Sequence, residues 1–143
     1  MNRIKVLWVD DEIEMLKPHF IFLEDRGYEV VPCNNGQDAL DLIKENIYEI
    51  ILLDENMPGL NGLETLQEIK ISNPLLPVIM ITKNEEEHIM ENAIGAKISD
   101  YLIKPVNPNQ ILLSLKKILN HKNLVDKKTI QNYQKEFGRL SMS

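Results

Sequence analysis

The segment Leu52–Gly62, LLDENMPGLNG, leaves an apolar run through three polar residues and then enters a turn rich in proline and glycine. The strand predicted here, Glu49–Asp54, has a continuously apolar interior, which is typical of a strand covered on both faces. Asp54 therefore stands at the carboxyl end of a predicted buried strand. An acid at this point either starts the turn, as aspartate often does, or belongs to a functional site.

Four other short apolar runs are separated by longer stretches with helical periodicity. These runs are Ile4–Val9, Tyr28–Cys33, Pro77–Thr82 and Ser99–Lys104. A strand–helix alternation repeated five times predicts a parallel sheet with helices on both faces, because crossovers between parallel strands are right-handed. We therefore predict a doubly wound, five-stranded α/β fold. In such a fold, functional groups gather beyond the carboxyl ends of the strands.

The predicted helices begin at residues whose side chains are suited to capping. Asp10 or Asp11 precedes a first helix that ends at Gly27 and contains Pro18, where we expect a kink or a lost hydrogen bond. The caps predicted for the other four helices are Asn35, Asn61 (in a capping box with Glu64), Asn84 and Asn107 (followed by Pro108).

The composition excludes several classes of protein. The chain has 143 residues and a net charge of −6, which disfavours direct nucleic-acid binding through a basic surface. One cysteine, Cys33, allows no disulfide within a single chain. The N-terminal apolar stretch is too short for a signal peptide, and no apolar run reaches the ~20 residues of a membrane span. We therefore expect a cytoplasmic protein with no membrane association.

Polar residues with related chemistry lie at the carboxyl ends of four of the five predicted strands. They are Asp10 and Asp11, Asp54 with Asn56 after it, Thr82, and Lys104. Each has an ordinary explanation when taken alone: a helix cap, a turn residue, a strand residue and a surface charge. Their occurrence together predicts one site, provided that the first, third, fourth and fifth strands are neighbours.

The charges of this set favour a metal ion. Two carboxylates ~4 Å apart repel by about 4 kcal/mol at an effective dielectric of 20, and three of them involve three such repulsions. A single lysine does not offset that repulsion, whereas Mg²⁺ binds several carboxylates and keeps room for a phosphoryl oxygen. Asp54 is then a candidate nucleophile that forms an acyl phosphate, with Lys104 and Thr82 holding the other phosphoryl oxygens.

The segments VDDE (Val9–Glu12), LLDENMPGLNGLE (Leu52–Glu64), MIT ending at Thr82, and YLIKP (Tyr101–Pro105) resemble the receiver domain of two-component response regulators. The resemblance covers about residues 3–121. It implies a flavodoxin-like strand order, 2-1-3-4-5, and Mg²⁺-dependent transfer of a phosphoryl group from a sensor histidine kinase to Asp54. It also implies that the domain catalyses its own phosphorylation and dephosphorylation, although it is not a conventional enzyme.

The same resemblance implies a role for each site residue. Asp11, Asp54 and the backbone carbonyl of Asn56 would bind the metal, and Asp10 would act through water. Thr82 and Tyr101 would form the switch pair that remodels the face of the fourth helix, fifth strand and fifth helix, with homodimerisation as one outcome. The peptide bond between Lys104 and Pro105 would be cis. Lys83, which follows Thr82, departs from the small residue that many receivers carry there.

Residues 122–143 are predicted to be a helical extension beyond a receiver domain of residues 1–121. Ile130, Tyr133, Phe137 and Leu140 recur at helical spacing and form one apolar stripe. The stripe either packs on its own domain, forms a dimer contact, or begins a C-terminal output domain that these residues do not contain. This stretch resembles PorX-type regulators, a resemblance that implies an output domain of the alkaline phosphatase (PglZ) superfamily and a role in type IX secretion.

Two other functions are compatible with the fold. A Mg²⁺-dependent phosphohydrolase for small substrates would use similar chemistry, but haloacid-dehalogenase-type enzymes place a D-x-D pattern on the first strand, where this chain has Asp10-Asp11-Glu12. An unphosphorylated pseudo-receiver that serves only as an interaction module is the other alternative. The complete set of site residues argues against it.

Overall fold

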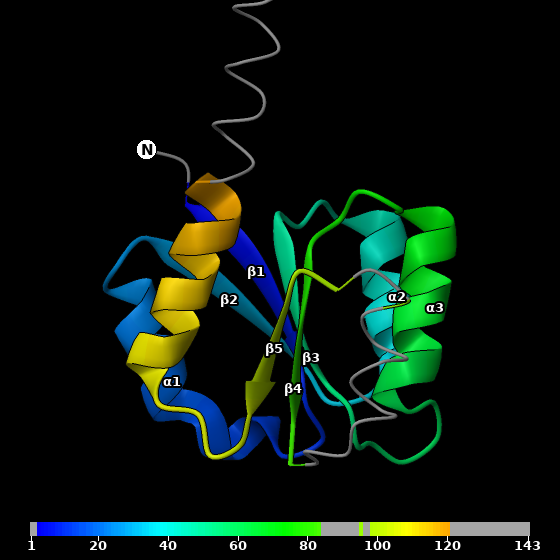
Figure 1. The fold of residues 1–143 in the computed structure, drawn as a ribbon, viewed down its shortest axis with the longest axis horizontal. Helices are drawn as coiled ribbons and strands as arrows, with labels where there is room; N and C mark the ends of the chain where they lie inside the picture. Colours follow the sequence, from blue (N-terminus) through cyan, green and yellow to red (C-terminus); the bar gives the residue numbers. More distant parts are fainter. Residues whose placement is uncertain (1–2, 84–94, 96–97, 121–143) are drawn as a thin grey trace, which may run out of the picture.

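The computed structural model describes residues 3–83, 95 and 98–120, and it forms a parallel five-stranded sheet between helices (Figure 1). The strands are β1 (Ile4–Val9), β2 (Tyr28–Cys33), β3 (Ile50–Asp54), β4 (Val78–Thr82) and β5 (Asp100–Ile103). Their spatial order is β2-β1-β3-β4-β5, and every neighbouring pair is parallel. The predicted doubly wound fold and its strand order are therefore confirmed.

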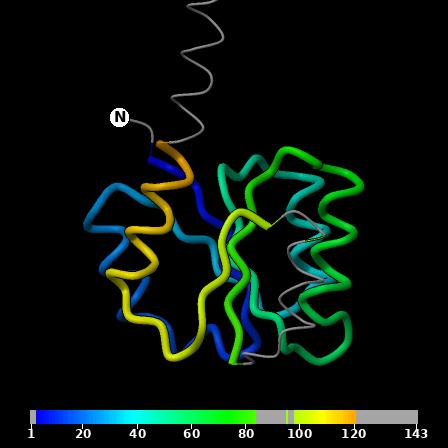
Figure 2. The backbone as a smooth tube through the Cα atoms, viewed as in Figure 1, coloured from blue at the N-terminus to red at the C-terminus, as the bar shows by residue number. Residues whose placement is uncertain are grey.

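Helices cover both faces of the sheet, as the tube in Figure 2 also shows. The helix α1 (Lys17–Glu24) and the helix of residues 108–120 lie on one face. The helices α2 (Gly36–Glu45) and α3 (Gly62–Ser72) lie on the other. The sheet thus separates two apolar cores, one around Trp8 and Ile81 and one around Leu53 and Met80. All residues of β3 and β4 are buried, which explains their apolar interiors.

The register of the sheet aligns the ends of its central strands. Val9 of β1 pairs with Leu53 of β3, and Asp54 pairs with Ile81 of β4. The last residue of β4, Thr82, pairs with Ile103 of β5. The residues at the carboxyl ends of these four strands consequently meet at one edge. The outer strand on the other side, β2, contains Pro32 opposite Trp8.

The predicted caps of three helices are present in the structure. The Asn35 side chain accepts a hydrogen bond from the backbone N–H of Asp38 at the start of α2. Asn61 and Glu64 form a reciprocal capping box at the start of α3. Asn107 and Gln110 bond to each other's backbone N–H groups in the same way before the helix of residues 108–120.

The predicted first helix is divided in two. A short 3₁₀ helix, η1 (Ile13–Leu16), precedes α1, and Pro18 lies in the first turn of α1. The predicted helix is therefore not one continuous helix with a kink, and its regular hydrogen-bonding pattern is instead interrupted just before Pro18. A proline in the first turn replaces an N–H that has no intrahelical partner, so it is compatible with a helix that starts there. Asp10 and Asp11 consequently do not cap α1.

Two predicted elements lie outside the described residues: the helix after Asn84 and the helical extension of residues 122–143. Within the described part of the chain, no helix is long and apolar enough to cross a membrane. The peptide bond between Lys104 and Pro105 is cis, as expected.

Candidate functional site

Three carboxylates converge at the edge of the sheet where β1 and β3 end. One oxygen from each of Asp10, Asp11 and Asp54 lies within 4.8 Å of the others. Asp10 and Asp54 are buried, at 2% and 3% exposure, and Asp11 is exposed. Among the described residues this is the one group of histidine, cysteine and acidic side chains close enough to share a metal ion. Its donors are hard oxygens, which suit Mg²⁺ or Ca²⁺.

Lys104 joins the two buried acids from the end of β5. Its Nζ lies 3.0 Å from Oδ2 of Asp10 and 3.3 Å from Oδ1 of Asp54. Burial by itself would lower the pKa of the Lys104 ammonium, but the two carboxylates outweigh that effect and raise it. Lys104 is therefore a fixed cation, and it compensates part of the negative charge of the cluster.

Lys104 does not fully offset the unfavourable negative charge of the Asp54 carboxylate. Burial, followed by repulsion from Asp10, raises its pKa from 3.8 to about 6, against the opposing effects of Lys104 and of the backbone N–H of Asn56. That N–H lies 3.3 Å from Oδ1 of Asp54. The negative charge on Asp54 is thus unfavourable near neutral pH without a further cation.

We expect the substitution Asp54→Asn to stabilise the metal-free protein at neutral pH. A raised native pKa means that the native state binds more protons than the unfolded state between about pH 4 and pH 6, so this group costs stability as the pH rises through that window. The full cost, on the order of 3 kcal/mol, is present above the native pKa. Thermal unfolding with a chelator present should show a larger gain for the variant at about pH 7.5 than at about pH 4.5.

An equal gain at both pH values would contradict this account, because the removed charge would then not be its source. Asp41→Asn is the matched control, since Asp41 is an exposed acid on α2. Its substitution should change stability little at either pH.

A small cavity of about 70 Å³ opens in front of Asp54. It is lined by Asp11, Glu12, Asp54, Asn56, Lys83 and Lys104. Asp10 is held at the back of the site, because its Oδ1 accepts a hydrogen bond of 2.8 Å from the backbone N–H of Glu12. The cavity therefore places carboxylates and two lysines around a space for small ions.

Thr82 and Tyr101 both interact with Glu55, a residue whose position in the site was not predicted from the sequence. The Thr82 hydroxyl, which is fully buried, donates a hydrogen bond of 3.3 Å to Oε2 of Glu55. Burial of the Tyr101 ring and the nearby charge of Glu55 raise the pKa of Tyr101, and a hydrogen bond with Thr82 opposes that rise. Glu55 thus accepts a hydrogen bond from Thr82, and its charge acts on Tyr101, the other member of the predicted switch pair. The proximity of Glu55 to Thr82 depends on the register between β3 and β4, which the sequence does not show.

Gly62 is a second residue whose importance was not predicted. A Cβ atom at this position would lie 2.5 Å from the Cα of Glu55 and would also overlap the carbonyl oxygen of Asp54. The Gly62 N–H donates a 2.8 Å hydrogen bond to the carbonyl of Glu55. The start of α3 therefore rests directly on the backbone of the Asp54 segment, and the missing side chain permits that contact.

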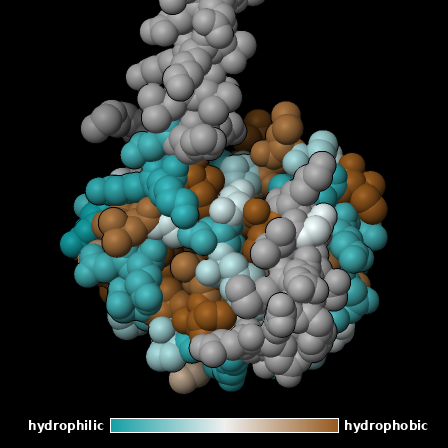
Figure 3. Space-filling model, viewed as in Figure 1, coloured by the Kyte–Doolittle hydropathy of each residue, from teal (hydrophilic) through white to brown (hydrophobic). Residues whose placement is uncertain are grey.

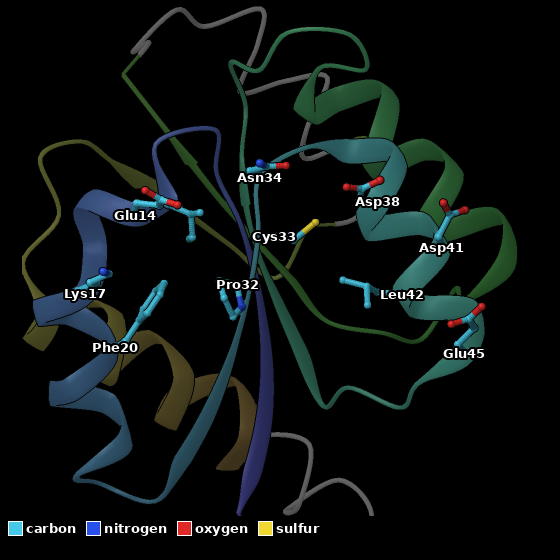
Figure 4. A pocket seen from close by; sticks show the side chains of 11 residues that line it. Glu14, Lys17, Phe20, Pro32, Cys33, Asn34, Asp38, Asp41, Leu42 and Glu45 are labelled. Carbon is cyan, nitrogen blue, oxygen red and sulfur yellow. The ribbon is translucent and has the colours of Figure 1, made fainter.

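A larger hollow lies elsewhere, over the outer strand β2 between α1 and α2 (Figure 4). Its volume is about 700 Å³, and its rim carries Glu14 on one side and Asp38, Asp41 and Glu45 on the other. These acids are not among the carboxylates that lie close enough to share a metal ion within the described residues. The small cavity, not the large groove, holds the chemically distinctive groups.

The structure brings together most of the predicted site residues. Asp10, Asp11, Asp54 and Lys104 lie in direct proximity, and Asn56 lines the same cavity. Thr82 and Tyr101 lie to one side of it, next to Glu55. Lys83, which stands where many receivers carry a small residue, lines the cavity as well.

Comparisons with known proteins agree with this geometry. Residues 6–116 match the family model of the response regulator receiver domain. The chain is 32% identical over 142 residues to the transcriptional regulatory protein ZraR of Escherichia coli K12, covering 99% of this chain and 32% of ZraR. It is 41% identical over 118 residues to the CpxR homolog of Haemophilus influenzae, covering 80% of this chain and 50% of that protein. The chain thus spans about a third of the length of ZraR and half of the length of the CpxR homolog.

Solved receiver domains share the fold. The receiver domain protein of Methanospirillum hungatei superposes with a TM-score of 0.80 at 27% identity, covering 85% of this chain and 97% of that one. The corresponding protein of Clostridium thermocellum gives a TM-score of 0.78 at 29% identity, with 85% and 98% covered. Because the family model spans most of the chain and these likenesses agree with it, the chain belongs to the receiver domain family of two-component response regulators.

Proposed function

We propose that this chain is a phosphorylation switch in which Asp54 accepts a phosphoryl group from a sensor histidine kinase. The observation that carries the proposal is the arrangement around Asp54. A buried carboxylate with a raised pKa faces a small cavity, is paired with Lys104, and lies next to two further acids. Phosphoryl transfer depends mainly on positioning and on charge stabilisation, and this arrangement supplies both.

The carboxylate cluster fits Mg²⁺. Asp11 and Asp54 would bind the ion directly, together with the backbone carbonyl of Asn56, and Asp10 would act through water. The bound ion would shield the negative charges of the carboxylates and of the phosphoryl group from each other. Support comes from the proximity of the three carboxylates and from the under-compensated charge on Asp54.

The residues of the chain have separate tasks in the transfer. An Asp54 oxygen forms a bond to phosphorus while the bond from phosphorus to the nitrogen of the kinase phosphohistidine breaks, and the imidazole leaves with that electron pair. Lys104 holds Asp54 in place and then contacts a phosphoryl oxygen. The Thr82 hydroxyl donates to another. Asp54 attacks as a carboxylate. Its raised pKa of about 6 is still below neutral pH, so the group is mostly ionised there although its charge costs stability.

The contact between Thr82 and Glu55 supports a switch. When the Thr82 hydroxyl turns to a phosphoryl oxygen, it gives up its bond to Glu55, and the half-buried Tyr101 ring moves inward. The affected surface includes β5 and the helix of residues 108–120, where apolar side chains are exposed beside hydrophilic ones (Figure 3). We propose that this surface controls an output domain or a partner and that phosphorylation promotes homodimerisation through it.

The organisation of the chain is part of the same proposal. Residues 1–121 would form the receiver domain, and residues 122–143 would be a helical extension that leads toward an output domain. The resemblance of that extension to PorX-type regulators favours an output domain of the alkaline phosphatase superfamily and a role in type IX secretion.

The proposal is tested by incubating the chain with Mg²⁺ and acetyl phosphate and measuring its intact mass. We expect the wild type to gain one phosphoryl group, and we expect Asp54→Asn to gain none because the nucleophilic oxygen is lost. Asp41→Asn, the exposed acid on α2, should behave as the wild type. A chelator should suppress the reaction.

Two outcomes would contradict the proposal and favour the alternatives. Continuous release of phosphate from varied phosphomonoesters would indicate a phosphohydrolase. Failure of the wild type to bind Mg²⁺ near neutral pH or to acquire a phosphoryl group would indicate an unphosphorylated interaction module. A mass gain that survives Asp54→Asn would refute the choice of nucleophile.

A further inference from the structure

Lys83 lies at the junction of two hollows on the functional edge of the sheet. It directly follows Thr82, the last residue of β4. Its side chain lines the cavity of about 70 Å³ in front of Asp54. It also lines a neighbouring hollow of about 500 Å³ whose wall includes Trp8 and Pro105. Glu12 and Lys104 also line both hollows, so Lys83 lies where the two hollows adjoin. We call the opening of the small cavity beside Lys83 the mouth of the site.

The two lysines of the cavity have different surroundings. The ammonium of Lys104 is held between Asp10 and Asp54 at 3.0 and 3.3 Å, and its side chain is 21% exposed. Lys83 is exposed, and within the described ranges it makes no ion pair. The ammonium of Lys104 is thus held by the two acids, whereas the ammonium of Lys83 can turn to an arriving anion.

The excess of negative charge around the cavity explains what a second lysine would contribute. The cavity and the wall behind it carry Asp10, Asp11, Glu12 and Asp54, against Lys104 and Lys83. A phosphoryl group adds roughly 1.5 to 2 negative charges at neutral pH. Without Lys83, the opening of the site would be bordered mainly by carboxylates, and these would repel an anionic phosphorylated donor.

We propose that Lys83 is the second cation of the phosphoryl site. Its ammonium contacts the outward-facing phosphoryl oxygen, and its aliphatic stem covers the mouth of the cavity. This inference rests on the proposed phosphorylation of Asp54. It assigns to Lys83 two effects: capture of the anionic donor, and protection of the acyl phosphate once it has formed.

The protective effect follows from the path of hydrolysis. A water oxygen forms a bond to phosphorus from the side opposite Asp54, the bond from phosphorus to the Asp54 oxygen breaks, and Asp54 recovers its carboxylate while inorganic phosphate leaves with the water's protons. That water has to enter through the mouth that Lys83 borders. A side chain positioned there reduces the access of that water by its bulk, so the aliphatic stem of Lys83 is the part that protects the acyl phosphate.

The two effects are separated by Lys83→Met, which keeps an unbranched stem without the charge, and by Lys83→Ala, which removes both. For Lys83→Met we expect the acetyl phosphate concentration at half-maximal rate to rise roughly two- to fivefold, the range of an exposed ion pair, with the saturating rate little changed. The half-maximal acetyl phosphate concentration of Lys83→Met should also depend less on ionic strength than that of the wild type. For Lys83→Ala we expect, in addition, a phosphoryl lifetime shortened by about the same factor.

Intact mass followed over time measures both quantities. The control is Lys44→Met, which removes an exposed lysine of α2 and should leave both unchanged. Lys83→Arg should retain most of the donor dependence because it keeps the charge. An unchanged donor dependence and lifetime in both Lys83→Met and Lys83→Ala would overturn the inference, as would faster phosphorylation of Lys83→Ala. Failure of the proposed function itself is distinguishable, since the wild type would then acquire no phosphoryl group.

Discussion

The substitution Gly62→Ala is expected to lower the free energy of unfolding by about 3 kcal/mol, the upper part of the range for overpacking. Helix propensity predicts the opposite sign, because Gly62 begins α3 and alanine is favoured over glycine inside helices by about 1 kcal/mol. Sterics decide the outcome. The new methyl group would lie 2.5 Å from the Cα of Glu55, and backbone atoms cannot move aside as the end of a flexible side chain does.

Urea unfolding of Gly62→Ala measures this effect, and Gly59→Ala is its matched control. Gly59 lies in the same loop at φ +76°, and a Cβ there would meet nothing within 4 Å. Its substitution should therefore cost only the strain of the left-handed backbone, about 1 kcal/mol. Equal losses for the two variants would contradict the steric account. If Gly62→Ala folds, phosphorylation should be slow, because α3 would displace the segment that carries Asp54.

The substitution Lys104→Met is expected to be the other strongly destabilising change, at about 3 kcal/mol. It leaves Asp10 and Asp54 buried and close together without their shared cation. Part of this cost is relieved if Asp54 takes up a proton, since its pKa is already raised and the loss of the lysine raises it further. The destabilisation should therefore increase as the pH rises, and thermal unfolding of the metal-free protein at several pH values measures it.

Lys83→Met is the matched control for stability. Lys83 lies at the same edge but is exposed, so its loss should change the free energy of unfolding by less than about 0.5 kcal/mol. Added Mg²⁺ should recover more stability in Lys104→Met than in the wild type, because the cluster then lacks its resident cation. A destabilisation of Lys104→Met that does not depend on pH would assign the effect to lost packing of the lysine stem instead of lost charge.

The elements that the sequence predicted well are those determined by local patterns. The interior of Glu49–Asp54 and the capping box of Asn61 and Glu64 depend on residues that are neighbours in the chain, and both are found in the structure. The division of the first helix was not predicted. The spacing of its apolar residues continues through η1 and α1, although the hydrogen-bonding pattern changes before Pro18.

The site residues that could be predicted from the sequence are those that lie at the ends of strands. Asp10, Asp54 and Lys104 each end or follow an apolar run, and the parallel sheet brings such ends together. Glu55 and Gly62 have no such signal. The bond from Thr82 to Glu55 depends on the alignment of two strands, and the close approach of Gly62 depends on how α3 is placed over β3. Both are tertiary properties that no local pattern encodes.

Pro32 has a consequence for how copies of this molecule associate. In the parallel pairing with β1, the carbonyl of Cys33 accepts a hydrogen bond from the N–H of Asp10, so the backbone groups of Cys33 point toward β1. The backbone of its neighbour Pro32 therefore points to the other side of β2, where no strand pairs with it among the described residues. A proline has no N–H to offer, and an incoming strand would find the ladder interrupted there. Addition of a strand from a second copy beside β2 is thereby disfavoured, so association of two copies on this side of the molecule would rely on side-chain contacts instead.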